Sequence, residues 1–220
     1  MRYYELFEDQ VLDEMPMPSD WDHSVFKPDV SYAKRIKYAV ERALKIGKGS
    51  SRSAFVITVD GRDTVLKVAH NKKGLAQNAA EAAILSDGYV QQLDITIPMI
   101  DYDEEHPEPL WINTERAMKG SESLLCNYMK CDSLFQIVNY ADNMLTGRPP
   151  ASTEKSVLEK HGEEGLEIFK DYAQRLAELS SSGDVKLVDF QHAPNWGFYK
   201  NHPVVLDVGF TSSVHSSHYS

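Results

Sequence analysis

The sequence predicts an α+β fold with two lobes. Short strand-type runs are grouped in the first half of the chain, and longer helical patterns fill most of the second half. Runs of strands followed by runs of helices are typical of α+β proteins. The 220 residues are enough for one large domain or two small lobes with a buried core. We expect an N-terminal extension (1–30), a strand-rich lobe (31–117) and a reduced helical lobe (118–220).

The strand-rich lobe is centred on a predicted hairpin. Residues 43–68 contain short apolar runs of strand type, and Asp60-Gly61 between two of them is a strong signal for a two-residue turn. A helix should precede the hairpin, because apolar residues recur at helical spacing after Ser31, a suitable N-cap. The expected order is a helix at 32–44, three antiparallel strands within 43–68, a helix at 73–86, and two strands in 94–105 and 109–117.

The second half of the chain shows mainly helical patterns. A stripe of apolar residues at helical spacing predicts a helix over 132–145, and the following TGRPPASTEKS is predicted as a loop because of its prolines and polar residues. The remaining expected elements are a long helix at 162–179, short strands in 185–190 and 203–210, and a polar, frayed end at 211–220.

Charge and hydropathy argue against several classes of function. The net charge of −10 and the pI near 5.2 make a nucleic-acid partner unexpected, because an acidic protein repels a phosphate backbone. No apolar run approaches the roughly 18 to 20 residues that a membrane span needs. The acidic N-terminus also lacks the pattern of a signal peptide. We therefore expect a cytoplasmic protein without a membrane partner.

The two cysteines, Cys126 and Cys131, are expected to be reduced, partly buried thiols. A zinc site would need two further ligands, and no nearby His pair has the spacing to supply them. A disulfide is disfavoured in a reducing compartment.

A glycine turn separates the first two predicted strands. In Gly47-Lys48-Gly49-Ser50-Ser51-Arg52, the glycines would let backbone N–H groups approach an anion closely, because no Cβ intervenes. The turn is neither a Walker loop nor a Rossmann turn, since a strand follows it and not a helix. The alternative is an ordinary hairpin turn without a ligand.

Lys67 lies inside the third strand, 18 residues after Gly49 (67 − 49). From there its ammonium can reach under the glycine turn towards a bound phosphate. A buried ammonium needs a counter-charge, and Glu81 on the next predicted helix offers one. The alternatives are that Lys67 points to solvent under strand alternation and that Glu81 is a solvated helix charge.

Asn195 and Asp207 flank a predicted short hairpin, 12 residues apart (207 − 195). Both side chains offer hard oxygens, which suit Mg²⁺ bridged to substrate phosphates. The alternative is a turn asparagine and a strand-end aspartate without a metal.

Taken in order, these features resemble the signature of the protein-kinase-like superfamily. The matching features are Gly-x-Gly-Ser, V-L-K-V-A, a helix glutamate, an asparagine and Asp-x-Gly, over about residues 43–211. The stretch GSSRSAF…VLKVAHNKKGLAQNAAE is similar to small kinase-like proteins of phages and bacteria. For a phage protein, the cytoplasm would be that of the host. The resemblance implies a two-lobed kinase-like fold with a truncated C-lobe, and ATP and Mg²⁺ as ligands.

The resemblance also assigns roles to individual residues. Lys67 would contact the α- and β-phosphates and pair with Glu81, and Asp207 would hold Mg²⁺ together with Asn195. The residues that would cover the phosphates are Gly47, Gly49, Ser50 and Ser51.

The chain departs from the kinase pattern in three places. Arg52 replaces the third glycine of the loop. The catalytic loop lacks H-R-D: Phe190 stands where the base is expected, while Asp189 lies six residues before Asn195 (195 − 189) and His192 three before it (195 − 192). Only 11 residues follow Gly209 (220 − 209), which leaves no room for the segment that usually grips a peptide.

Asp189 and His192 therefore compete as the residue that orients the acceptor. Strand alternation over residues 186–190 would put Val188 and Phe190 on one face and Asp189 on the other, towards the cleft or solvent. We accordingly expect Asp189 to act on the acceptor and His192 to brace the loop by hydrogen bonding.

The predicted function is phosphoryl transfer from ATP to a hydroxyl of a protein or small molecule. The alternatives are an inactive pseudokinase that serves as a binding module, and a nucleotidyl (AMP) transferase on the same scaffold. The acceptor should contact residues 1–30 or the predicted loop 146–162, because both are rich in proline and charge. In the extension, the aromatic residues expected to contribute are Tyr3, Tyr4, Phe7, Trp21 and Phe26. The alternative is that these aromatic residues simply pack across the lobes.

Overall fold

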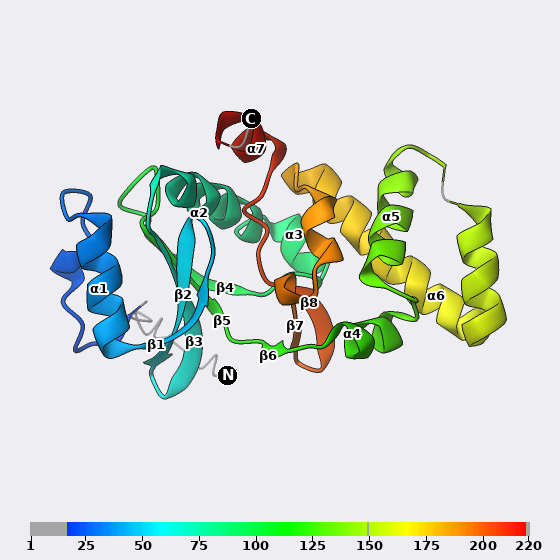
Figure 1. Cartoon of the computed structure of the whole chain (residues 1–220), viewed down its shortest axis with the longest axis horizontal. Helices are drawn as coiled ribbons and strands as arrows, with labels where there is room; N and C mark the ends of the chain where they lie inside the picture. The colour runs from blue at the N-terminus through cyan, green and yellow to red at the C-terminus, as the bar shows by residue number, and fades with distance from the viewer. Residues whose placement is uncertain (1–16, 149, 219–220) are drawn as a thin grey trace, which may run out of the picture.

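A computed structural model describes residues 17–148 and 150–218, and it confirms the α+β class with two lobes. Figure 1 shows a sheet and helix α1 at one end of an elongated molecule and helices α5 and α6 at the other, with α2 and α3 between them. Tyr3, Tyr4 and Phe7 lie outside the described residues.

The strand-rich lobe follows the predicted order closely. Its elements are η1 (His23–Val25), α1 (Tyr32–Arg42), β1 (Leu44–Lys48), β2 (Arg52–Val59), β3 (Arg62–Ala69), α2 (Lys72–Leu85), α3 (Gly88–Gln92), β4 (Met99–Tyr102) and β5 (Trp111–Glu115). The five strands form one sheet in the order β1-β2-β3-β5-β4, and each pair of neighbours is antiparallel. The sequence patterns missed the short α3 and the 3-10 helix η1.

The second lobe contains the other elements. They are β6 (Met118–Lys119), α4 (Glu122–Met129), α5 (Leu134–Leu145), α6 (Ala151–Gly183), η2 (Leu187–Gln191), η3 (Ala193–Asn195), β7 (Trp196–Tyr199), β8 (His202–Val205) and α7 (Ser212–His218). Strands β6, β7 and β8 make a small sheet in that order.

The β2–β3 hairpin sets the register of the central sheet. Asp60 and Gly61 have φ values of 50° and 77°, as a tight turn with two left-handed residues requires. Val59 therefore faces Arg62, and counting back along both strands brings Ala54 opposite Lys67. The sequence signal for this turn was correct, and it fixes which residues share a face of the sheet.

Residues 17–30 pack into the strand-rich lobe. Trp21 and Phe26 are 7% and 5% exposed, and their rings stack with centroids 6.0 Å apart. Tyr38 of α1 meets both rings edge-on. Trp21 and Phe26 are therefore core residues and are not exposed to bind a partner.

The molecule has two apolar cores, and helix α2 contributes to both. Leu75, near the start of α2, belongs to the core of the strand-rich lobe, while Ile84 and Leu85, at its end, belong to the core of the second lobe. Residues 95–97 also cross over, since Val205 of β8 donates to the carbonyl of Ile95 and Ile97 donates to that of Val205. The boundary at residues 117 and 118 stays a prediction.

The predicted loop after α5 is wrong beyond residue 150. Helix α6 begins at Ala151, and only Gly162, with φ 72° and ψ −175°, departs from helical geometry inside it. Val157 is 2% exposed, and Glu154 accepts hydrogen bonds from Tyr140 (2.5 Å) and Lys170 (2.6 Å). These contacts outweigh the polar composition, so a deletion of residues 147–158 would damage the core.

Two further local predictions are corrected. Residues 187–191 form a 3-10 helix and not a strand, so Val188 is 51% exposed whereas Phe190 is fully buried. At the C-terminal end, residues 212–218 form α7, held by Val214, which is 5% exposed. In both segments a buried apolar side chain, Phe190 or Val214, holds a short sequence in a helical turn. Hydrophobic periodicity is measured over a longer window and does not detect a single buried residue.

Cys126 and Cys131 are both buried free thiols, as predicted. Within residues 17–148 and 150–218, no helix combines the length and the apolar character needed to cross a membrane.

Candidate functional site

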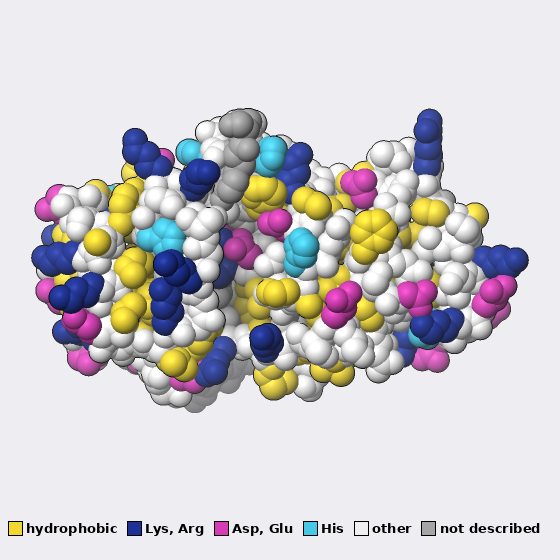
Figure 2. All heavy atoms as spheres, in the orientation of Figure 1, with side chains coloured by type: hydrophobic (Ala, Val, Ile, Leu, Met, Phe, Trp, Pro, Cys, Tyr) yellow, Lys and Arg dark blue, Asp and Glu magenta, His cyan; other side chains and the backbone are white. Residues whose placement is uncertain are grey.

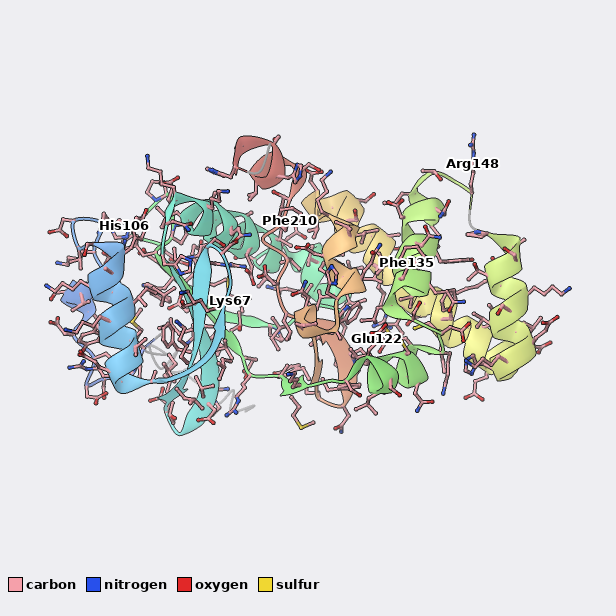
Figure 3. All side chains as sticks on the ribbon, in the orientation of Figure 1. Lys67, His106, Glu122, Phe135, Arg148 and Phe210 are labelled. Carbon is pink, nitrogen blue, oxygen red and sulfur yellow. The ribbon has the colours of Figure 1, made fainter. Side chains whose placement is uncertain are left out.

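Lys67 and Glu81 form a buried ion pair between the sheet and α2. Lys67 Nζ donates to Glu81 Oε1 and, at 2.5 Å, to the backbone carbonyl of Leu206. Glu81 is fully buried and Lys67 is 8% exposed. Figure 3 shows Lys67 on β3, where the sheet meets the second lobe. The expected pair is present, and the alternative of two solvated charges is wrong.

Arg52 lies on the same face of the sheet as Lys67. The hairpin register puts Ala54 opposite Lys67, and Arg52 is two residues from Ala54 on β2. Residues two apart on a strand share a face, so the guanidinium is directed towards α2. The sequence marked Arg52 only as a departure from a glycine pattern, although the register of the Asp60-Gly61 turn already indicated this placement.

The Arg52 guanidinium bridges three acceptors. Its Nη1 donates to Glu81 Oε2 (2.5 Å) and to Asn78 Oδ1 (3.2 Å), while Nη2 donates to Asp207 Oδ1 (2.5 Å). Together with Lys67 this makes a network of two cations and two carboxylates, which joins β2, β3 and α2 to the segment after β8.

The network controls the ionisation of Asp207. Burial alone would raise the pKa of this carboxyl, but the positive charges of Arg52 and Lys67, with hydrogen bonds from Arg52 and Gly209, hold its pKa below the usual range. Burial likewise opposes the charge on Arg52, yet Asp207 and Glu81 raise its pKa above the ordinary value. Asp207 and Arg52 therefore both stay charged at neutral pH.

The Asp-x-Gly segment packs closely on α2. The backbone N–H of Gly209 donates to Asp207 Oδ1 at 3.1 Å. A Cβ on Gly209 would lie 2.7 Å from the carbonyl oxygen of Gln77, closer than backbone allows. A residue without a side chain is therefore required here, and it keeps the Asp207 carboxylate against the N-lobe helix.

The predicted catalytic loop is built from two 3-10 turns. Asn195 Nδ2 donates to the carbonyl of Asp189 (2.7 Å), and the N–H of Leu206 donates to the carbonyl of Asn195 (2.8 Å). Trp196 Nε1 donates to the carbonyl of Phe190 (2.8 Å). These bonds hold the loop beside β8 without a regular ladder.

Asp189 and His192 lie near Asp207 and at the surface. Asp189 is half-buried and His192 is exposed. Burial and the nearby negative charge of Asp207 raise the pKa of Asp189, and His192 partly offsets this. Figure 2 shows acidic and histidine side chains at the junction of the two lobes. The structure therefore brings Asp189, Asp207 and the Lys67–Glu81 pair into one region.

The glycine turn is tied to the start of α2. Ser51 Oγ donates to Gln77, the N–H of His70 donates to the carbonyl of Ser51 (2.9 Å), and Asn71 Nδ2 donates to that of Ser50 (2.9 Å). The Ser51 side chain is thus buried in packing, while Ser50 is exposed.

Nothing in the packing of the turn demands glycine at positions 47 and 49. A Cβ at either position would meet its nearest neighbour at 3.6 Å, an ordinary contact. Neither residue is among the glycines with positive φ. Close approach of a ligand to the backbone is a reason for glycine that remains.

The donor set fits a hard cation bridged to phosphates. Within the described part of the chain, no three His, Cys, Asp or Glu side chains gather as ligands of an all-protein metal site. Mg²⁺ in nucleotide sites needs only one or two carboxylates together with phosphate oxygens, and Asp207 with Asn195 supplies this chemistry. Asp207 already neutralises a cation, the Arg52 guanidinium.

The likeness of this chain to known proteins is confined to solved structures. No protein-family model matches the chain, and no curated protein matches it. Among solved structures, the chain is similar to the crystal structure of aminoglycoside phosphotransferase APH(4)-Ia, with 15% sequence identity and a TM-score of 0.28. The match covers 50% of this chain and 37% of the phosphotransferase.

Proposed function

We propose that this chain is a kinase-like phosphotransferase that binds ATP and Mg²⁺ between its lobes and acts on a hydroxyl group. The observation that carries the proposal is the convergence of Lys67, Glu81 and Asp207, since Lys67 Nζ contacts both Glu81 and the carbonyl of Leu206. A strand lysine paired with a helix glutamate, next to an aspartate after a hairpin, is the arrangement that positions and neutralises phosphates.

In this proposal each residue of the candidate site has one role. Lys67 binds the α- and β-phosphates while Glu81 fixes its position. Asp207 and Asn195 hold the metal, which neutralises phosphate charge when it is bound. The backbone of the glycine turn, from Gly47 to Ser51, covers the phosphates.

Asp189 orients the acceptor hydroxyl and accepts its proton. Its raised pKa supports this role, because a general base works best when its pKa approaches the working pH. His192, exposed on the same loop, braces the loop by hydrogen bonding, since its N–H donates to the carbonyl of Asp189 (3.3 Å) and its carbonyl accepts from the N–H of Asn195 (3.0 Å).

Labelled nucleotides test the proposal. The purified chain is incubated with Mg²⁺ and γ-³²P-ATP or α-³²P-ATP, with cell lysate as a source of acceptors. Label transferred from the γ position, and lost in Asp207→Asn and Lys67→Met, is the expected result. Label from the α position alone would mean AMP transfer, and no label in either reaction would contradict an enzymatic function.

A second candidate, a pseudokinase that binds a partner, is favoured by one observation. Arg52 donates to Asp207, the residue proposed as metal ligand, and a guanidinium there competes with a metal for the same oxygen. The absence of a transfer product, together with retained nucleotide binding, would select this candidate.

A further inference from the structure

The charged network opens to solvent at Asp207. The side chains of Glu81, Arg52 and Lys67 are 0%, 6% and 10% exposed, whereas that of Asp207 is 42% exposed. A ligand that arrives from solvent therefore meets the network at Asp207. The cation it meets there is the Arg52 guanidinium, whose Nη2 donates to Asp207 Oδ1.

The other edge of the Arg52 guanidinium is anchored. Its Nη1 donates to Glu81 and to Asn78, and Asn78 is itself fully buried and fixed by a bond from Nδ2 to the carbonyl of Pro109 (2.9 Å). A guanidinium carries five N–H donors in one rigid plane, so one edge can change its acceptor while the other stays bound. Arg52 can thus exchange the partner of Nη2 without moving its strand.

We propose that Arg52 is a second phosphate-binding cation of this site, one that exchanges Asp207 for a nucleotide phosphate. Before binding, Nη2 of Arg52 neutralises Asp207. When a metal–nucleotide complex binds, Arg52 releases Asp207 to the metal and donates Nη2 to a phosphate oxygen beside it. The inference rests on the proposed function and adds Arg52 to the residues that bind the phosphates. Arg52 stands at the position where the kinase pattern has its third glycine.

The charge balance explains why such an exchange is favourable. The network alone pairs two cations with two carboxylates, so it has no net charge to attract phosphate. Once a divalent cation neutralises Asp207, Arg52 is left with an unpaired edge at the opening. A bidentate cation with no partner in a partly buried site gains most from an anionic oxygen.

Two ligands measured separately on Arg52→Met test this exchange. The probes are Mn²⁺ alone, followed by electron paramagnetic resonance, and the Mg²⁺ complex of a non-hydrolysable ATP analogue, followed by calorimetry. Mn²⁺ alone should bind about 3- to 10-fold more tightly, because Asp207 has lost a competing cation. The nucleotide complex should bind about 10- to 100-fold more weakly, as expected for a lost charged hydrogen bond.

The opposite signs of these two effects are the signature of the exchange. If both ligands bind more tightly, Arg52 only blocks access to Asp207, and the inference is overturned. If both bind more weakly, or neither changes, Arg52 is only a structural residue and the inference is likewise overturned. Arg116→Met, which removes a surface arginine paired with Asp63, is the matched control and should change neither affinity.

Two further variants separate the possible failures. Arg52→Lys is the variant to use if Arg52→Met does not fold, because lysine keeps the buried positive charge. One ammonium cannot bridge Glu81 and Asp207. The affinities for Mn²⁺ and for the nucleotide complex should therefore change in the same opposite directions, but by less.

Lys67→Met tests the proposed function itself. Loss of nucleotide binding in Lys67→Met but not in Arg52→Met overturns only the role of Arg52. A wild-type protein that does not bind the nucleotide complex overturns both.

Discussion

The two halves of the candidate site are built in different ways. On the strand-rich side, Arg52, Lys67 and Glu81 are buried and project from regular strands and a helix. On the other side, the half-buried Asp189 lies in η2 and the exposed His192 lies between η2 and η3. The first half is fixed by strand register, and the second by individual hydrogen bonds to backbone carbonyls.

This difference separates stability from chemistry. A buried charge that loses its partner is costly, so the residues of the first half should contribute strongly to folding. A half-exposed carboxylate near a like charge destabilises the fold slightly and is available to react. Comparing variants of the two halves tests this division.

Glu81→Gln should have the largest effect. The neutral amide leaves the buried cations Lys67 and Arg52 without a shared counter-charge, and we expect the free energy of unfolding to fall by about 3–5 kcal/mol. Urea unfolding followed by circular dichroism measures this change. The control is Glu115→Gln, whose salt bridge with Arg62 is 3.6 Å long and partly exposed, and which should cost less than about 1 kcal/mol. Equal losses in both variants would remove the distinction between the halves.

Asp189→Asn should lower turnover without lowering stability. If Asp189 orients the acceptor, phosphate transfer should fall by about 10²- to 10⁴-fold, as is usual for loss of a general base. His192→Ala should reduce transfer less, because the backbone hydrogen bonds by which this residue braces the loop remain in the variant. Initial rates of γ-phosphate transfer, with unfolding curves on the same samples, give both quantities. The reverse ranking of the two variants would exclude Asp189 as the base.

Asn195→Ala should have an intermediate effect on folding. The variant loses the bond from Nδ2 to the carbonyl of Asp189, and a partly buried carbonyl without its donor costs about 1–2 kcal/mol. Asn143→Ala is a matched control, since Asn143 Nδ2 donates to the carbonyl of Asn139 over the same 2.7 Å but on an exposed helix surface. Chemical denaturation of the two variants should differ by more than about 0.5 kcal/mol. No difference would mean that the amide does not hold the loop.

The smallest effects should appear in the pH dependence, and they should have opposite signs for Asp207, which is paired with Arg52 of the strand-rich half, and for Asp189. Asp207 has a lowered pKa in the folded protein, so its stabilisation is present above the unfolded value of 3.8 and is lost as pH falls through the folded pKa. Asp189 has a raised pKa, so its contribution is present at low pH and is lost as pH rises through the folded pKa.

Unfolding of Asp207→Asn and Asp189→Asn over a pH series measures this difference. The cost of Asp207→Asn should be greatest at neutral pH and should disappear in strong acid. Asp189→Asn should be at least as stable as wild type at neutral pH, and this advantage should disappear as pH falls. Parallel pH profiles of the two variants would contradict the opposite shifts.

Sequence periodicity predicted the strand-rich half of the site well. Local sequence patterns are sufficient to predict three of its elements. These are the Asp60-Gly61 turn, the strand that contains Lys67 and the alanine-rich helix that contains Glu81. Two-residue turns set register, and register sets which side chains meet. The same count puts Arg52 on the face of the sheet that carries Lys67, whereas its contact with Asp207, 155 positions further along the chain, is not contained in the register.

The other half could not be predicted in the same way. Residues 187–191 alternate like a strand, yet they form a 3-10 helix in which Phe190 is buried and Val188 is exposed. The first turns of α6 were predicted as a loop because the sequence there is rich in proline and charge. They are helical because Val157 is buried and Glu154 accepts hydrogen bonds from Tyr140 and Lys170. Such contacts are tertiary, so a local window does not contain them.

Helix α2 has one end in each apolar core, and this constrains how the protein unfolds. Its first turns hold Leu75 in one core, and its last turns hold Ile84 and Leu85 in the other. Melting either lobe would strip apolar surface from a helix that the other lobe still needs. The two lobes should therefore lose structure in a single cooperative transition, and neither half of the chain should fold when it is produced alone.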